Sequence, residues 1–116
     1  MATFSKIALS GSTDGRMIKV VQTATAGTTL HTGSATATTF DEIWLYANNT
    51  SASAVKLTLE WGTATAADGN IELTIAAESG LVLVVPGLIL QNTKVVKAFA
   101  ATADVILLTG YVNQIS

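Results

Sequence analysis

The fold class is decided by residues 55–61, Val-Lys-Leu-Thr-Leu-Glu-Trp. Apolar side chains stand at every odd position and polar ones at every even position. This period of two is typical of a β-strand with one buried face and one solvated face. We therefore predict a strand at Ala54–Trp61, with Lys56, Thr58 and Glu60 facing outward. Residues 70–76 repeat the alternation and predict a second strand.

Short apolar runs separated by turn residues continue in both directions along the chain. Asp14-Gly15 predicts a hairpin turn, and Pro86-Gly87 predicts the end of a strand. No stretch shows sustained helical periodicity. The remaining predicted strands are Phe4–Leu9, Met17–Gln22, a short strand around Leu30, Phe40–Ala47, Leu81–Val85, Leu88–Leu90, Lys94–Phe99 and Val105–Asn113. Their number and spacing predict one all-β domain over residues 1–116, a jelly-roll-like antiparallel β-sandwich of eight to nine short strands.

The composition favours a subunit of an assembly. Hydrophobic residues make up 49% of the chain and charged residues only 12%, against about 25% charged in an average globular protein. Low surface charge weakens the repulsion between copies. The six basic residues are scattered, so we expect no nucleic-acid partner. The first residues do not predict a signal peptide, and the longest central apolar run is too short for a membrane helix, so we expect no membrane partner and synthesis in the host cytoplasm.

Two strands are apolar on both faces. Leu81–Val85 has high β-propensity and no charge, so we predict either a central strand covered on both sides or a strand at a subunit interface. Ile43–Tyr46 carries large apolar side chains on both faces and raises the same question. We therefore expect self-association, most simply as a homotrimer. The hypothetical interface residues are Ile43, Trp44, Leu45, Tyr46, Leu81, Val82, Leu83, Val84 and Val85.

No pattern for catalysis or metal binding emerges from the sequence. The single histidine, His31, has no nucleophile signature beside it, so we interpret it as a surface or interface residue. The ligands of a zinc site are absent. Asp14-Gly15 and Asp68-Gly69-Asn70 are interpreted as turns rather than calcium loops. We therefore expect no cofactor, no metal and no enzymatic activity.

The carboxylates and the aromatic residues leave further alternatives open. Adjacent Asp41 and Glu42 should point to opposite faces of a strand and cannot act together. Glu60 and Glu72 should lie on a solvated face, with Lys56 as a possible cation between them. A sugar-stacking platform would use four aromatic residues: Trp44, Tyr46, Tyr111 and Trp61. Of these, Trp61 occupies an inward position of its strand, which favours packing in the core.

The chain resembles the small β-rich virion proteins of tailed bacteriophages, especially capsid decoration (cement) proteins. The resemblance covers nearly the whole chain in overall style. It is carried by residues 9–16 and 41–48, by residues 79–87 and by the ending Leu108-Thr109-Gly110-Tyr111-Val112-Asn113.

The resemblance implies a non-enzymatic structural protein that binds the outside of a phage head, often as a trimer. Its partners would be further copies of itself and the major capsid protein, and its location the exterior of the virion. Two alternatives stay open: a carbohydrate- or receptor-binding module of a head or tail fibre, and a small enzyme with His31 beside an acid in a pocket.

Overall fold

A computed structural model of the chain describes residues 2–116. Within these residues it contains nine strands and no helix, so the predicted all-β class is confirmed. The strands are β1 (Phe4–Ile7), β2 (Ile18–Lys19), β3 (Thr28–Thr32), β4 (Phe40–Asn49), β5 (Val55–Trp61), β6 (Asn70–Ile75), β7 (Val82–Leu90), β8 (Val95–Ala100) and β9 (Ile106–Ile115).

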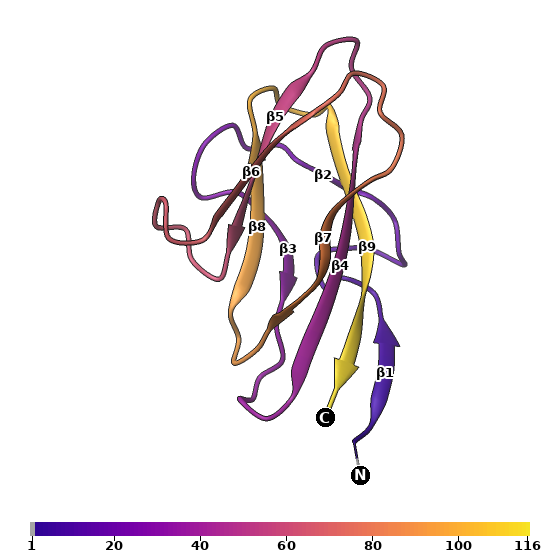
Figure 1. The fold of residues 1–116 in the computed structure, drawn as a ribbon, viewed down its shortest axis with the longest axis vertical. Coiled ribbons are helices and arrows are strands. Elements are labelled where there is room, and N and C mark those ends of the chain that lie inside the picture. The colour runs from indigo at the N-terminus through magenta and orange to yellow at the C-terminus, as the bar shows by residue number, and fades with distance from the viewer. Residues whose placement is uncertain (1) are drawn as a thin grey trace.

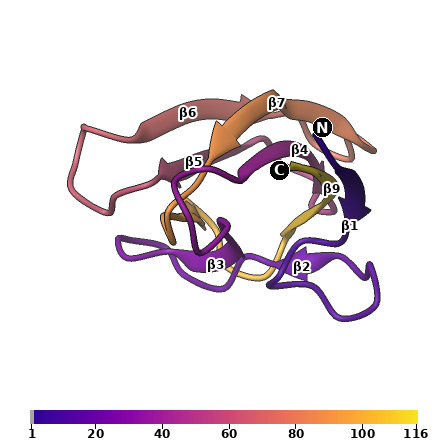
Figure 2. The ribbon, with the colours of Figure 1, turned by 90° about the horizontal axis from the view of Figure 1, so that it is seen from below.

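The strands form two antiparallel sheets that pack together (Figure 1). Sheet A has the order β1-β9-β4-β7, and β2 also pairs with β9. Sheet B has the order β3-β8-β5-β6. Figure 2 shows that β6 and β7 run along one side of the molecule, and β2 and β3 along the other. Both sheets therefore contribute an inner face to a shared core.

Strand pairing is nested along the chain. The β5–β6 hairpin lies at the centre, and around it β4 pairs with β7, β3 with β8, and both β1 and β2 with β9. Successive nested pairs belong to alternate sheets. Each pairing outside the central hairpin therefore joins residues far apart in the sequence.

The core is built from the alternate residues that point between the sheets. In β5, the inward side chains of Val55, Leu57 and Leu59 are buried as predicted. Of the three outward residues only Lys56 is exposed, because Thr58 and Glu60 are buried as well. The core side chains with no exposed surface include Val20, Leu30, Ile43, Leu45, Val85, Val96, Ile106, Leu108 and Val112. Burial of apolar area at about 25 cal/mol per Å² is the main stabilising contribution of this layer.

Pro86-Gly87 does not end a strand, so that prediction was wrong. β7 continues through both residues, and its register with β4 shifts at Gly87 and again at Val84. Gly87 is the extra residue between Pro86, which pairs with Trp44, and Leu88, which pairs with Ile43. β7 pairs only with β4 in the described chain, so the missing N–H of Pro86 costs no bond to a second neighbouring strand.

β7 is an edge strand, and this excludes one of the two predictions for Leu81–Val85. The segment is not a central strand covered on both faces, because its far edge has no strand partner within residues 2–116. Only Val85 is fully buried, whereas Leu81, Val82 and Leu83 are exposed. The interface hypothesis for this segment remains a prediction.

Candidate functional site

His31 lies in the core with 2% of its surface exposed, so its interpretation as a surface residue was wrong. The register of β3 with β8 shifts between Thr29 and His31, which lets Leu30 and His31 both point inward. The His31 Nε2 atom lies 2.7 Å from Asp41 Oδ2, and the Ser10 N–H donates to His31 Nδ1 over 2.9 Å. Gln114 Nε2 donates to Asp41 Oδ1 over 2.9 Å.

This arrangement assigns the proton on the imidazole. Because Nδ1 accepts from a backbone N–H, the neutral ring carries its proton on Nε2 and donates it to Asp41. Both ring nitrogens are thereby engaged, and the Ser10 hydroxyl accepts from the Thr32 N–H instead of contacting the ring. The cluster ties β3, β4 and β9 together, and it offers no free nitrogen to act as a general base.

The carboxylates divide between two environments. Asp41 is buried and Glu42 points outward, which confirms that the pair lies on opposite faces of β4. Glu60 is 1% exposed, so its assignment to a solvated face was wrong. Its carboxylate accepts hydrogen bonds from Thr25 Oγ1 and from the Gly27 N–H, over 2.5 and 2.6 Å. The loop that precedes β3 therefore covers this part of sheet B.

Glu72 behaves as predicted. It is half exposed, and its Oε1 lies 3.4 Å from Lys56 Nζ. An exposed ion pair of this kind contributes little to stability, about 0–1 kcal/mol.

The two candidate calcium loops are turns. Asp14 and Gly15 both have positive φ angles, and Asp68 N–H donates to the Thr65 carbonyl within a turn that leads into β6. No group of three or more potential metal-binding side chains (His, Cys, Asp or Glu) is found within residues 2–116.

The outer face of sheet A is apolar and aromatic. Residues directly opposite each other in an antiparallel ladder share a face, so the register defines rows of outward side chains across the sheet. The rows are Phe4–Ile115–Phe40, Lys6–Asn113–Glu42–Ile89, Tyr111–Trp44–Pro86 and Thr109–Tyr46–Leu83. We call this surface the apolar face.

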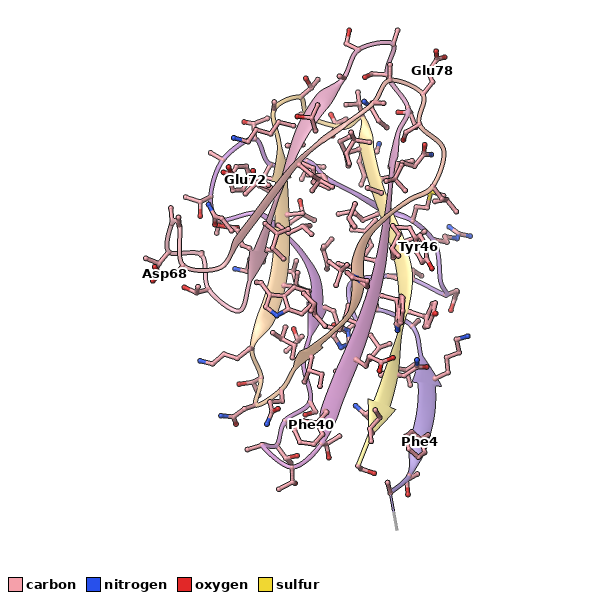
Figure 3. The ribbon with its side chains drawn as sticks, in the orientation of Figure 1. Phe4, Phe40, Tyr46, Asp68, Glu72 and Glu78 are labelled. Atoms are coloured by element: carbon pink, nitrogen blue, oxygen red, sulfur yellow. The ribbon has the colours of Figure 1, made fainter. Side chains whose placement is uncertain are left out.

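The outer face of sheet B has the opposite character. Its rows are Lys97–Glu60–Asn70, Phe99–Thr58–Glu72 and Lys56–Thr74. None of the large hydrophobic side chains exposed in residues 2–116 belongs to a strand of sheet B. In Figure 3, Phe4 and Tyr46 lie on the sheet A side and Asp68 and Glu72 on the sheet B side. The two outer faces therefore differ: sheet A exposes large apolar side chains, whereas sheet B carries polar residues, of which Thr58 and Glu60 are themselves buried.

A row of packed aromatic side chains crosses the centre of the apolar face. The rings of Trp44 and Tyr111 are stacked, with centroids 6.2 Å apart and planes 15° apart. Lys6 Nζ lies 4.3 Å from the Tyr111 ring centroid. On the other side, a Cβ at Gly87 would lie 3.0 Å from Trp44 Cζ2, so the bulge in β7 fits the indole. Trp44 and Tyr111 thus each have a neighbour on both sides.

The nine hypothetical interface residues separate into three groups. Ile43, Leu45 and Val85 belong to the core. Trp44 and Tyr46 are half-buried on the apolar face, and Val84 is half-buried beside a register shift of β7. The three exposed members are Leu81, Val82 and Leu83.

Sequence reasoning missed the part of the apolar face that lies near the chain termini. Phe4 is 72% exposed, and Phe40 and Ile89 are also exposed. The available signal was the period of two in each strand, which places Phe4 and Lys6 on one face of β1 and places Tyr111 and Ile115 on one face of β9. That signal becomes informative only when the register places β1, β9 and β4 side by side.

A groove of about 460 Å³ lies on the apolar face beside β1. Its lining residues are Phe4, Ser5, Lys6, Glu42, Asn113 and Ile115. Glu42 Oε1 accepts hydrogen bonds from Trp44 Nε1 over 2.8 Å and from Asn113 Nδ2 over 3.0 Å. These bonds favour the ionised carboxylate and therefore hold the pKa of Glu42 below its ordinary value. The bond from Trp44 has the larger effect and the bond from Asn113 the smaller one.

We expect the Trp44→Phe substitution to raise the pKa of Glu42 towards its ordinary value, because phenylalanine cannot donate the stronger of the two bonds. A folded-state pKa that is lowered stabilises the fold above the unfolded-state pKa, and this contribution is lost as the pH falls through the folded-state value. An NMR titration of the Glu42 carboxyl carbon measures the midpoint. Asn113→Ala is the matched variant and should raise the midpoint less. An unchanged midpoint in Trp44→Phe would contradict the assignment.

No helix in residues 2–116 has the length and apolar character needed to cross a membrane. Comparison of the chain with protein-family models, with curated proteins and with solved structures gave no match.

Proposed function

We propose that the chain is a non-enzymatic structural protein of a phage virion that decorates the outside of the capsid and stabilises the head. The observation that carries this proposal is the contrast between the two outer faces, with an apolar face on sheet A and a polar face on sheet B. Monomeric proteins rarely expose a large apolar surface, whereas an assembly module must offer one to its partner. The proposed partners are further copies of the chain and the major capsid protein.

We further propose that the two sheets form a jelly roll. The nested pairing of β1 and β2 with β9, β3 with β8, β4 with β7 and β5 with β6 supports this topology, because it corresponds to one long hairpin rolled into two sheets. Jelly rolls occur both in viral capsid proteins and in lectins. The chemistry of the apolar face, rather than the fold, therefore supports the functional proposal.

A decoration protein stabilises a head by mass action, because it binds the assembled shell and not the free subunit. The apolar face suits this role, since its burial releases water without requiring many charged groups to be desolvated. Lys6 and Glu42 are its only charged residues in the four rows.

The carbohydrate-binding alternative has one observation in its favour, which is the gathering of Trp44, Tyr46 and Tyr111 on a single face. Trp61, the fourth residue of the predicted platform, instead packs against the core. A sugar stacks on a free ring face. Trp44 lies between Gly87 and Tyr111, and Tyr111 lies next to Lys6, so two of the three rings already have neighbours within the chain. We therefore place this function second.

Light scattering during gel filtration tests the proposed self-association. We expect a mass of about three times the 11.9 kDa chain. Because apolar contacts would hold the trimer, it should persist in 1 M NaCl, where the Debye length falls to about 3 Å. Dissociation at high salt would instead indicate an electrostatic interface and contradict this account.

Cosedimentation tests decoration itself. The probe is a preparation of heads from the phage that encodes the chain, purified without the protein. We expect the protein to sediment with the heads at saturable stoichiometry, and a protein that stays in the supernatant would overturn the proposed function.

A further inference from the structure

The apolar face ends at two different surfaces on opposite edges of sheet A. At the β7 edge, a strip of exposed side chains, which we call the β7 rim, consists of Leu81, Val82, Leu83, Leu88 and Ile89. Leu83 and Ile89 lie on the apolar face, whereas Val82 and Leu88 pair with Ala47 and Ile43 and lie on the other side of this edge. At the β1 edge lies the groove lined by Phe4, Ser5, Lys6, Glu42, Asn113 and Ile115, which we call the β1 groove. We infer that the β7 rim of one copy of the chain docks into the β1 groove of the next copy, in a head-to-tail contact.

The rim needs an apolar partner. No charged residue occurs from Leu81 to Leu90, and Leu83 and Ile89 expose 45% and 53% of their surface. Leu83 lies opposite Tyr46, and Ile89 lies opposite Glu42, so both project from the apolar face. At about 25 cal/mol per Å², covering such side chains favours association.

The groove suits an uncharged occupant. Phe4 and Ile115 provide apolar walls. The carboxylate of Glu42 already accepts two hydrogen bonds from within the chain, and Lys6 already lies over the Tyr111 ring. An aliphatic side chain can therefore enter between them without leaving a newly unpaired polar group at the contact. The uncharged rim can therefore contact Phe4 and Ile115 in the groove without bringing a third charge beside Lys6 and Glu42.

The contact must form between copies. Neighbouring strands lie about 4.8 Å apart, so β1 and β7 are separated by about 14 Å across sheet A and face away from each other. Ile89 borders the groove at Glu42, but one chain cannot bring its own Leu83 from the β7 edge to Phe4 and Ile115 at the β1 edge.

A symmetric contact between two β7 rims explains the structure less well. It would leave the β1 groove uncovered, together with Phe4, the most exposed large hydrophobic side chain among the described residues. Extension of sheet A by edge pairing at β7 is also disfavoured, because Pro86 lacks an N–H and two register shifts interrupt the strand. A contact between two different surfaces closes into a ring when the rotation permits, and the proposed trimer is such a ring.

Complementation between two variants tests the inference, which rests on the self-association in the proposed function. Leu83→Asp disables the rim and leaves the groove intact, whereas Phe4→Asp disables the groove and leaves the rim intact. Both positions are exposed, so both variants should fold. We expect each variant alone to have the mass of one chain. An equimolar mixture should have about twice the 11.9 kDa mass, because one working rim then meets one working groove.

Val21→Asp is the matched control. Val21 is 48% exposed but belongs to neither surface, so this variant should retain the wild-type mass. The masses are compared at the concentration at which the wild-type protein is fully assembled. A Phe4→Asp variant that still assembles, or a mixture that stays at the mass of one chain, would overturn the inference.

The two proposals can fail separately. Wild-type protein that is monomeric in solution but sediments with heads would overturn the rim-to-groove contact and leave decoration standing. A heterodimer in the mixture, together with wild-type protein that does not sediment with heads, would confirm the contact and overturn decoration.

Discussion

Gly110→Ala is expected to destabilise the fold by about 4 kcal/mol, a large share of the 5–15 kcal/mol by which a typical domain is stable. A Cβ at this position would lie 1.9 Å from the Trp44 carbonyl oxygen and 2.9 Å from its carbonyl carbon. β4 cannot retreat, because it pairs with β9 on one side and β7 on the other. Gly110 also has a φ of 155°, which side chains rarely adopt. Overpacking and backbone strain therefore add.

Urea unfolding followed by tryptophan fluorescence, at one fixed protein concentration, measures this effect. Gly80→Ala is the matched control, because Gly80 has a φ of 66° and a Cβ there would meet nothing within 4 Å. It should cost about 1–2 kcal/mol through backbone strain alone. The difference between the two variants then reports the clash with β4 together with the greater backbone strain at Gly110. Equal losses would show that β4 and β9 do not approach as closely as described.

Asp41→Ala is expected to cost about 1–3 kcal/mol, the usual penalty for leaving a buried hydrogen-bond donor without its acceptor. The substitution removes the only acceptor recorded for His31 Nε2 and for Gln114 Nε2 within residues 2–116. Both donors would lose their bonds, and the loss at His31 would occur in the core. Because the cluster joins β3, β4 and β9, the loss should appear as lower stability of the whole domain in the same urea assay.

Asp41→Asn separates hydrogen bonding from charge. Asparagine keeps one acceptor for His31, and the Gln114 amide can rotate to accept from the new NH₂ group. We expect a cost of about 1 kcal/mol for this variant. If the stability of Asp41→Ala is itself within about 1 kcal/mol of the wild type, the buried cluster does not stabilise the fold.

The local sequence pattern predicted where strands occur, but it did not predict where one of them, β7, ends. The alternation at residues 55–61 and 70–76 predicted β5 and β6 closely. Pro86-Gly87 was misinterpreted because a proline ends a strand only where its N–H is needed for pairing. An edge strand pairs on one side only, so the missing N–H of a proline can be tolerated there. Whether a strand lies at the edge of a sheet cannot be predicted from its neighbouring residues in the sequence.

The candidate site was predictable in part. The uncharged segment Leu81–Val85 drew attention to β7, and three of its side chains are exposed at the edge of sheet A. Phe4, Ile115 and the β1 groove were missed, because the two ends of the chain become neighbours only through the pairing of β1 with β9. Short stretches of sequence carry no information about such a contact.

Local periodicity was sufficient to predict the all-β class and the two-faced character of most strands, because successive side chains of an extended backbone point to opposite faces. What covers each face depends on the way the strands and loops pack together. Leu30 is the extra residue at the register shift of β3, which lets the His31 side chain point into the core. The loop at Thr25 and Gly27 covers Glu60. The strand order leaves the outer face of sheet A apolar and uncovered. These outcomes depend on contacts between residues far apart in the chain, and local periodicity does not encode them.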